Sequence, residues 1–380
     1  MSFGGNMRIG IMDADLIYRR RHRFPNLVCM KLAGYHKQIG NEVVLHTRKD
    51  VSPADGYDLL YVAKVFTDTP LDIKGVVESL KNTKVIYNGT GFFFDNAMPL
   101  PREIEHTMPD YHLYDNWLKG KIGGKGNDNI AKWYQDYSIG FLTRGCFRHC
   151  PFCVNQRFNK VEKASPLEEF LDTDRPKIAM LDDNFLGYPH WKEELQKLMD
   201  TNKPFVFRQG LDERVLNEEM AEMLFASRYD GDMMFAFDNI EETPVIERKL
   251  KMMEKYRTKK TVKFYVLTGF KNVGVADIVS AFQRIELLMK YHCLPYVTVY
   301  RGPEGRLIDS SPYRGMYVAL ARWANMPRMF KKTSFRQFCL INQEAVKTGK
   351  CSALLAMEMF EKEYPDIAKK FFDMRYEDAY

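Results

Sequence analysis

Short apolar runs alternate with helical patterns along the first third of the chain. Each run is bounded by polar or turn residues, as is typical of buried parallel strands, and the runs occupy residues 7–12, 42–46, 59–65 and 84–88. Pro25–Ile39 between the first two runs has helical spacing. We therefore predict an α/β domain with a Rossmann-like parallel sheet over residues 1–115.

A second alternation begins at Tyr137 and is longer. Strand-like runs recur at residues 138–142, 177–181, 204–208, 232–237, 261–267 and 294–300. Helical spacing separates most of them, at residues 191–200, 217–227, 245–255 and 275–292. Six strand–helix repeats predict a parallel β/α domain over residues 137–312, and the remainder, residues 313–380, reads as a helical extension.

The stretch between the two alternating regions has a different composition. Residues 116–136 are rich in lysine, glycine and asparagine and show no apolar period. We predict a flexible linker or a flap over a binding site.

Length and composition narrow the class of protein. A chain of 380 residues with 45% hydrophobic residues is long enough for two domains with their own cores. It shows neither a signal-peptide pattern nor an apolar run of about 18 residues, so we expect no contact with a membrane. Four cysteines are scattered without pairwise spacing, which predicts no disulfide framework and a reducing, cytoplasmic location: Cys29, Cys293, Cys339 and Cys351.

The net charge of +6 is concentrated near the N-terminus, where residues 1–50 carry nine Lys/Arg and four Asp/Glu. The densest part, Arg19–Arg23, has the charge to grip the phosphates of a nucleotide or nucleic acid, or is a solvated loop. The turn Asn88–Gly91 follows the fourth apolar run, where ligands of parallel sheets bind. Its Gly-x-Gly spacing fits a binding turn or simply a tight turn.

Three cysteines lie close together directly after the first run of the second region. Cys146, Cys150 and Cys153 have the spacing C-x3-C-x2-C, and Phe152 precedes the last of them. Thiolates are the ligands of [4Fe–4S] clusters, and three of them leave one iron open. With His149 they are also the donors of a Cys3His zinc site, although zinc modules usually draw on two separated pairs.

In its spacing, its aromatic Phe152 and its place after an apolar strand, this motif resembles the cluster loop of radical S-adenosylmethionine (SAM) enzymes. The resemblance implies a [4Fe–4S] cluster on the three cysteines and SAM on the open iron. It also implies a partial (β/α)6, TIM-like barrel that is open on one side. An electron from a donor such as flavodoxin or ferredoxin then cleaves SAM to methionine and a 5′-deoxyadenosyl radical, which takes hydrogen from a substrate.

The N-terminal domain resembles the cobalamin-binding-like domain found in one branch of these enzymes. That branch commonly carries an Asp-x-His-x-x-Gly stretch, which this sequence lacks, so we expect no cobalamin. The segments His22–Leu32 and Arg322–Pro327 resemble bacterial and phage-type radical SAM proteins to which we assign no function.

Polar residues follow the barrel strands, where functional groups of such folds gather. Asp182 and Asp183 after the second strand resemble a turn that contacts the methionine part of SAM, or they serve as turn residues. Arg208 after the third strand is a candidate for the SAM carboxylate, and Gln209 for the ribose or the substrate. Salt bridges that support the loop are the alternative.

Later strands supply three further candidates. Asp238 resembles the acidic residue that relatives use on the ribose hydroxyls. Gly269 would let the backbone approach the adenosine closely. Cys293 is a candidate hydrogen-atom donor to a product radical, or an ordinary buried cysteine.

The substrate is left open between classes. The basic N-terminal segment favours a nucleotide, an RNA or another small anion. The open barrel and the segment 116–136 favour a peptide or protein. A third reading is a zinc module without catalysis that binds nucleic acid.

Overall fold

The computed structural model describes residues 6–19, 24–121, 128–257, 259–302, 305–344, 346 and 348–376. Contacts divide the chain into two compact units, which are described separately: unit 1 is Met1–Asp182 with Gln196–Phe205, and unit 2 is Asp183–Leu195 with Val206–Tyr380. Arg20–Arg23 of the basic run and residues 122–127 of the expected linker lie outside the described residues. The domain limits inferred from the sequence stay predictions.

Unit 1 contains the expected N-terminal sheet. Its strands are parallel, in the order β2-β1-β3-β4, and span β1 (Arg8–Asp13), β2 (Glu42–His46), β3 (Leu59–Ala63) and β4 (Lys84–Asn88). Ile9 of β1 is paired with Val43 on one side and Leu59 on the other. The strand order places the switch in winding direction between β1 and β3, where ligands of such sheets bind.

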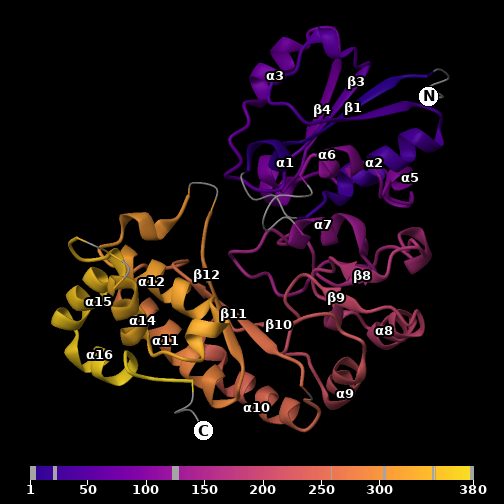
Figure 1. Cartoon of the computed structure of the whole chain (residues 1–380). Helices are drawn as coiled ribbons and strands as arrows, with labels where there is room; N and C mark the ends of the chain where they lie inside the picture. The colour runs from indigo at the N-terminus through magenta and orange to yellow at the C-terminus, as the bar shows by residue number, and fades with distance from the viewer. Residues whose placement is uncertain are drawn as a thin grey trace. The chain divides into compact units, whose positions relative to one another are not determined.

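Helices cover both faces of this sheet (Figure 1). Val76 and Leu80 at α3 pack on the face formed by Met12, Leu60 and Val62. The helices of unit 1 are α1 (Ala14–Tyr18), α2 (Leu27–Gln38), α3 (Ile73–Ser79), α4 (Thr90–Phe93), α5 (Arg102–Glu105), α6 (Asp115–Lys119) and α7 (Asp128–Gln135). The segment expected to be a linker thus contains α7 and most of α6, where Leu118 and Tyr134 are buried.

A second sheet leads to the three cysteines. It contains β5 (Tyr137–Gly140), β8 (Lys177–Met180) and β9 (Phe205–Phe207) in that order. β5 and β8 are parallel, with Gly140 opposite Met180. Beyond β5, the short strands β6 (Thr143–Arg144) and β7 (Glu162–Lys163) form an antiparallel pair that we did not predict.

Unit 2 contains the last three predicted strands as a parallel sheet: β10 (Met233–Ala236), β11 (Val262–Thr268) and β12 (Leu294–Val299). A single bridge between Leu211 and Phe235 pairs the segment after β9 with β10. The α/β class with parallel sheets is therefore confirmed. Across the described ranges the strand pairings form no closed barrel.

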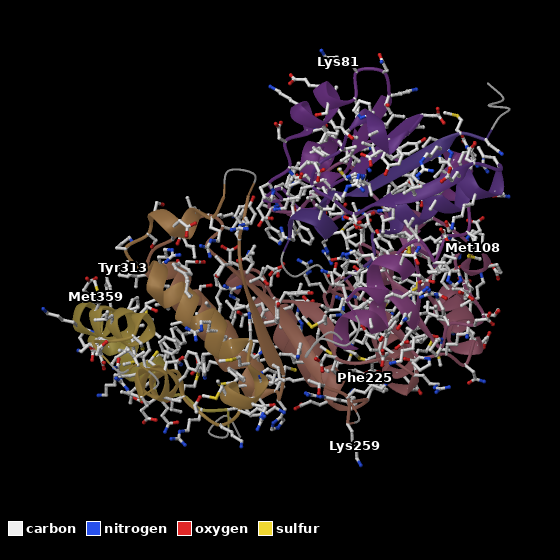
Figure 2. The ribbon with its side chains drawn as sticks, turned by 45° about the horizontal axis from the view of Figure 1, so that its top comes forward. Lys81, Met108, Phe225, Lys259, Tyr313 and Met359 are labelled. Atoms are coloured by element: carbon white, nitrogen blue, oxygen red, sulfur yellow. The ribbon has the colours of Figure 1, made fainter. Side chains whose placement is uncertain are left out.

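Helices account for the rest of unit 2 and for the C-terminal extension. They are α8 (Trp191–Asp200, at the boundary of the units), α9 (Glu218–Ala226), α10 (Thr243–Glu254), α11 (Val275–Lys290), α12 (Arg314–Ala324), α13 (Pro327–Phe330), α14 (Phe335–Glu344), α15 (Ser352–Glu363) and α16 (Pro365–Phe371). Tyr313 joins α12 to the end of α15 through a 2.9 Å hydrogen bond to Glu363, while Met359 extends away from the ribbon (Figure 2). Within the described part of the chain, no helix has the length and apolar character needed to cross a membrane.

Candidate functional site

The three cysteines lie on one excursion of the chain that leaves β6 and returns at β7. Thr143 pairs with Lys163, and Arg144 with Glu162. Two further backbone hydrogen bonds, from Ala164 to Leu142 (2.8 Å) and from Ser165 to Phe141 (3.2 Å), extend this pairing toward β5. Both ends of the loop are therefore held together, and Cys146, Cys150 and Cys153 are confined to the residues between them.

Gly145 makes the sharp departure from β6 possible. Its φ of +96° is in the left-handed region, and a Cβ there would lie 2.4 Å from the carbonyl oxygen of Lys160. Only glycine fits this combination of backbone conformation and close approach. The residue before the first cysteine is thus fixed by the returning arm of the loop.

Hydrogen bonds fold the loop around its second and third cysteines. The Cys153 N–H donates to the Cys150 carbonyl (2.9 Å), as does the Gln156 side-chain amide (2.7 Å). The Asn155 N–H donates to the Cys153 sulfur at 3.4 Å. Backbone donors to sulfur are an established influence on iron–sulfur clusters, because they stabilise charge on the ligand.

His149 is turned toward the backbone of its own loop. Its Nδ1 lies 3.1 Å from the Gln156 carbonyl oxygen, to which it donates when protonated. Over the described residues, no three His, Cys, Asp or Glu side chains converge on one position for a metal ion. Thiolates are the ligands that [4Fe–4S] clusters use, so the three cysteines of this loop fit such a group by their chemistry.

Three arginines on and beside the loop stack on neighbouring aromatic rings. The guanidinium carbon lies 3.5 Å from the ring centre for Arg144 on Phe141, 4.9 Å for Arg148 on Phe147 and 5.0 Å for Arg157 on Phe158. Stacking holds these cations in defined places. The loop thus presents positive charge, which favours an anionic group nearby.

Asp182, predicted to contact SAM, is almost completely buried at the end of β8. Its carboxylate accepts hydrogen bonds from the Leu142 N–H (3.2 Å), the Thr143 N–H (2.7 Å) and the Thr143 hydroxyl (2.7 Å). The structure therefore brings Asp182 to the start of the cysteine loop. Its predicted contact with SAM stays a prediction beside this observed contact.

Asp238, the predicted ribose ligand, is bound to the backbone of the next strand. Its carboxylate accepts the Leu267 N–H at 3.1 Å. Burial raises the pKa of Asp238 to about 6, and the Arg284 guanidinium partly offsets this. Buried Arg284 donates to the carbonyl oxygens of Phe237 (2.9 Å), Asp238 (3.1 Å) and Leu267 (2.9 Å), so it ties the ends of β10 and β11 together.

The other candidates in unit 2 differ in exposure. Arg208 and Gln209 are exposed after β9, and Asp183 is half-buried. Gly269 has a φ of +70°, donates its N–H to Asp277 at 2.7 Å, and would place a Cβ 2.5 Å from the Ile308 side chain. Packing inside unit 2 thus already accounts for a glycine at this position.

The segment after β9 contains a charged cluster, and its ion pairs fit the expected alternative of salt bridges that support this loop. Arg214 contacts the carboxylates of Asp212 (2.7 Å) and Glu242 (2.5 Å). Fully buried Glu213 accepts the Ala236 N–H at 3.0 Å through one oxygen, and burial raises its pKa to about 8. Asp212-Glu213-Arg214 directly after a predicted strand was the available signal. Asp212 is close to Arg214 in sequence, whereas Glu242 lies 28 residues from Arg214 and Ala236 lies 23 residues from Glu213, so the sequence did not identify these two partners.

Cys293 is the candidate that the geometry does not support. It lies before the N-terminal end of β12, whereas Asp238 and Gly269 follow the C-terminal ends of the parallel strands β10 and β11. A six-residue strand separates these edges by roughly 20 Å. Cys293 is buried, its thiol donates to the Tyr291 carbonyl (3.3 Å), and burial raises its pKa to about 12. These contacts are those of a buried cysteine, and its role as a hydrogen-atom donor stays an untested prediction.

The Gly-x-Gly turn after β4 is a packing turn. A Cβ on Gly89 would lie 2.1 Å from the Lys64 carbonyl oxygen, and one on Gly91 would lie 2.5 Å from the Lys64 side chain. The glycines thus allow this turn to pack against the end of β3. Of the basic run, Arg19 is described, and it pairs with Asp68 and stacks on Phe66.

Comparison with solved structures finds chains of similar fold. The radical SAM methyltransferase TsrM from Kitasatospora setae, solved with cobalamin and a [4Fe–4S] cluster bound, matches with a TM-score of 0.52 at 11% identity. The match covers 82% of this chain and 78% of TsrM. Two structures of the cobalamin-dependent SAM radical enzyme OxsB match with TM-scores of 0.45 and 0.46, at 11% and 12% identity. They cover 82% and 95% of this chain, which spans less than two thirds of OxsB, at 56% and 62%.

The sequence comparisons add no relative. No protein-family model matches the chain, and no curated protein matches its sequence. The similarity to TsrM is therefore one of structure, and the chain shares the fold of a radical SAM enzyme.

Proposed function

We propose that this chain is a radical SAM enzyme whose [4Fe–4S] cluster is held by Cys146, Cys150 and Cys153. One observation carries the proposal. The three cysteines share a single loop that is closed by the pairing of β6 with β7, in a chain with the fold of TsrM. Neither the spacing of the cysteines nor the fold alone would support the proposal as strongly, because short cysteine motifs also bind zinc.

When bound, the cluster and SAM supply a one-electron cleavage that yields methionine and a 5′-deoxyadenosyl radical. The role of the protein residues is to bind and orient the cluster and SAM. The cysteines hold three corners of the cluster and leave one iron for SAM, and Phe152 flanks the third cysteine. Asp183 and Arg208 would receive the amino and carboxylate groups of SAM. Gln209, Asp238 and the backbone at Gly269 would contact the ribose and adenosine.

For the substrate we favour a nucleotide, an RNA or another small anion. The arginines stacked along the cysteine loop support this choice, because they hold positive charge beside the proposed cluster. A peptide or protein substrate is the alternative. The electron would come from a small carrier protein such as flavodoxin or ferredoxin.

Cobalamin is bound in the TsrM structure, so that comparison gives no support to our expectation that it is absent here. The contacts at the β1/β3 edge of this chain favour the expectation. The Asp15 carboxylate accepts the Val65 N–H (2.7 Å) and the Thr69 hydroxyl, so it joins the start of α1 to the segment after β3, at the edge where ligands of such sheets bind. We therefore propose an enzyme that works without cobalamin.

The test is anaerobic reconstitution with iron and sulfide, followed by chromatography for 5′-deoxyadenosine after SAM and dithionite are added. We expect brown protein with about four irons per chain and formation of 5′-deoxyadenosine. Alanine at Cys146, Cys150 or Cys153 should abolish both. Cys351→Ser is the matched control, because Cys351 lies outside the loop and serine can still cap α15 at Leu354. Colourless protein with one zinc would refute the proposal and favour a zinc module.

A further inference from the structure

We propose that Asp182 is a positioning residue that fixes the start of the cysteine loop. This inference rests on the proposed function, because it assigns Asp182 to the support of the cluster ligands. The observation behind it is geometric: three hydrogen-bond donors from two consecutive residues, Leu142 and Thr143, converge on one buried carboxylate.

The need for such a residue follows from the course of the backbone. β5 is paired with β8 as far as Gly140, and the Leu181 N–H still donates to the Gly140 carbonyl at 2.9 Å. Beyond Gly140 the chain leaves β8 and pairs with the arm that leads from β7. The N–H groups of Leu142 and Thr143 are buried at this departure and need acceptors. Asp182, two residues beyond the end of β8, supplies them.

The three hydrogen bonds require a side chain with two acceptor oxygens, which aspartate provides. An ionised carboxylate only accepts, and its two oxygens serve all three donors here. One oxygen receives the N–H and the hydroxyl of Thr143, and the other receives the Leu142 N–H. In Asp182→Asn, an amide NH2 would replace one of these oxygens and face a backbone N–H. The variant therefore loses at least one bond and sets two donors against each other, with little change in volume.

A change at Asp182 would affect the position of Cys146, because only Thr143, Arg144 and Gly145 connect this cysteine to the hydrogen-bonded segment. Thr143 is followed by Arg144, which pairs with Glu162, and then by Gly145, which is pressed against Lys160. Cys146 comes next. A displacement at Thr143 therefore moves the first cysteine relative to the returning arm, which alters the shape of the loop before any cofactor binds.

The first experiment uses the metal-free protein and does not depend on the proposed function. Amide hydrogen exchange at Leu142 and Thr143 is compared in the wild type and in Asp182→Asn. We expect exchange at the amide that faces the new NH2 group to become roughly tenfold faster in the variant, since that amide loses its buried acceptor. Asp174→Asn is the matched control, because Asp174 is an exposed aspartate of the same unit. Unchanged exchange at both amides in Asp182→Asn would overturn the proposal.

The second experiment follows the reconstituted cluster. In Asp182→Asn we expect a lower iron content after desalting and an altered electron paramagnetic resonance spectrum of the reduced cluster without SAM. Thr143→Val, which removes the hydroxyl, should shift the spectrum in the same direction. Thr143→Ser keeps the hydroxyl and should restore the wild-type spectrum.

The same data separate positioning from direct binding of SAM. A normal spectrum without SAM, combined with weaker SAM binding, would show that Asp182 acts on SAM and would overturn the positioning role. Wild-type protein that takes up no iron would refute the proposed function and with it the cluster role of Asp182. The hydrogen-exchange measurement would still test the hydrogen bonds to Asp182, because it uses the metal-free protein.

Discussion

The carboxylate of Asp238 accepts the backbone N–H of Leu267 at 3.1 Å, so a side chain ties the end of β10 to β11. The same device recurs between Glu213 and the Ala236 N–H and between Asp182 and the Thr143 N–H. At each place, the carboxylate of an acidic residue that follows a strand accepts a backbone N–H, as a backbone carbonyl oxygen does within a regular sheet. Carboxylates that look like ligands in the sequence thus also hold strand ends in place.

Asp238→Asn should separate these two roles. Asparagine can still accept the Leu267 N–H through its carbonyl oxygen, so we expect little change in thermal stability. If Asp238 also binds the ribose of SAM, the dissociation constant for SAM should rise about tenfold or more, since a charge-assisted bond is lost. Wild-type binding should weaken as the pH falls below about 6, where Asp238 becomes protonated, and the variant should lack this dependence. Equal SAM affinity at pH 7.5, measured by calorimetry, would remove Asp238 from the site.

Arg284→Met should destabilise the folded protein by about 3–5 kcal/mol, since removing one partner of a buried charged network leaves its acceptors without donors. The carbonyl oxygens of Phe237, Asp238 and Leu267 would lose the guanidinium. Urea unfolding of the metal-free protein measures the change. Arg314→Met is the control, because Arg314 is half-exposed and contacts Asp309 at the surface. Equal losses for both variants would contradict the assigned role.

Glu213→Gln should change how stability depends on pH. Burial raises the pKa of Glu213 from 4.5 to about 8, so the folded state holds this proton more tightly than the unfolded state. The resulting stabilisation is complete below pH 4.5 and is lost as the pH rises toward 8. Glutamine has no proton to lose, so the variant should match the wild type near pH 5 and exceed it near pH 9, by a few kcal/mol at roughly 1.4 kcal/mol per pH unit.

Thermal melting at several pH values checks this expectation. Glu222→Gln, at an exposed position of α9, serves as the control and should follow the wild type. Melting curves of Glu213→Gln that run parallel to those of the wild type would show that Glu213 is charged in the folded protein.

Gly145→Ala should disturb the cysteine loop more than the cost of an alanine at a positive φ alone would. Alanine at a positive φ costs about 1–2 kcal/mol, and here its Cβ also meets the Lys160 carbonyl at 2.4 Å. Gly231 has a similar φ of +83° with open space around it, so Gly231→Ala isolates the backbone cost. We expect iron content after reconstitution to fall in Gly145→Ala and to stay normal in Gly231→Ala. Normal iron content in both would show that the loop adapts.

The sequence predicted the elements better than it predicted their connections. Strands β2 and β4 and helix α8 match their predicted limits, because apolar runs and helical spacing reflect burial directly. The pair β6–β7 was missed, since two-residue strands carry no period and depend on partners about twenty residues away. The helices α6 and α7 were missed because a lysine- and glycine-rich composition obscured the buried side chains Leu118 and Tyr134.

For the candidate site, spacing identified the cysteine loop, while the roles of the acidic residues needed the structure. Asp182 was predicted as a contact of SAM, which stays a prediction, and its observed partner Thr143 is separated from it in sequence by the whole loop and by β7. Cys293 was chosen by its proximity to a strand, and the direction of β12 places it at the wrong edge. A sequence gives the position of a residue along a strand, but not which neighbouring backbone group its side chain will reach.

The pairing of β6 with β7 has a consequence for the order in which the protein matures. Because both arms of the loop are joined by backbone hydrogen bonds, most of the entropy of bringing the three sulfurs together is lost when the polypeptide folds. The proposed cluster would then be loaded onto a loop whose two ends are already joined, as a separate event after folding. Its iron would accordingly be removable and replaceable without unfolding of the polypeptide around it.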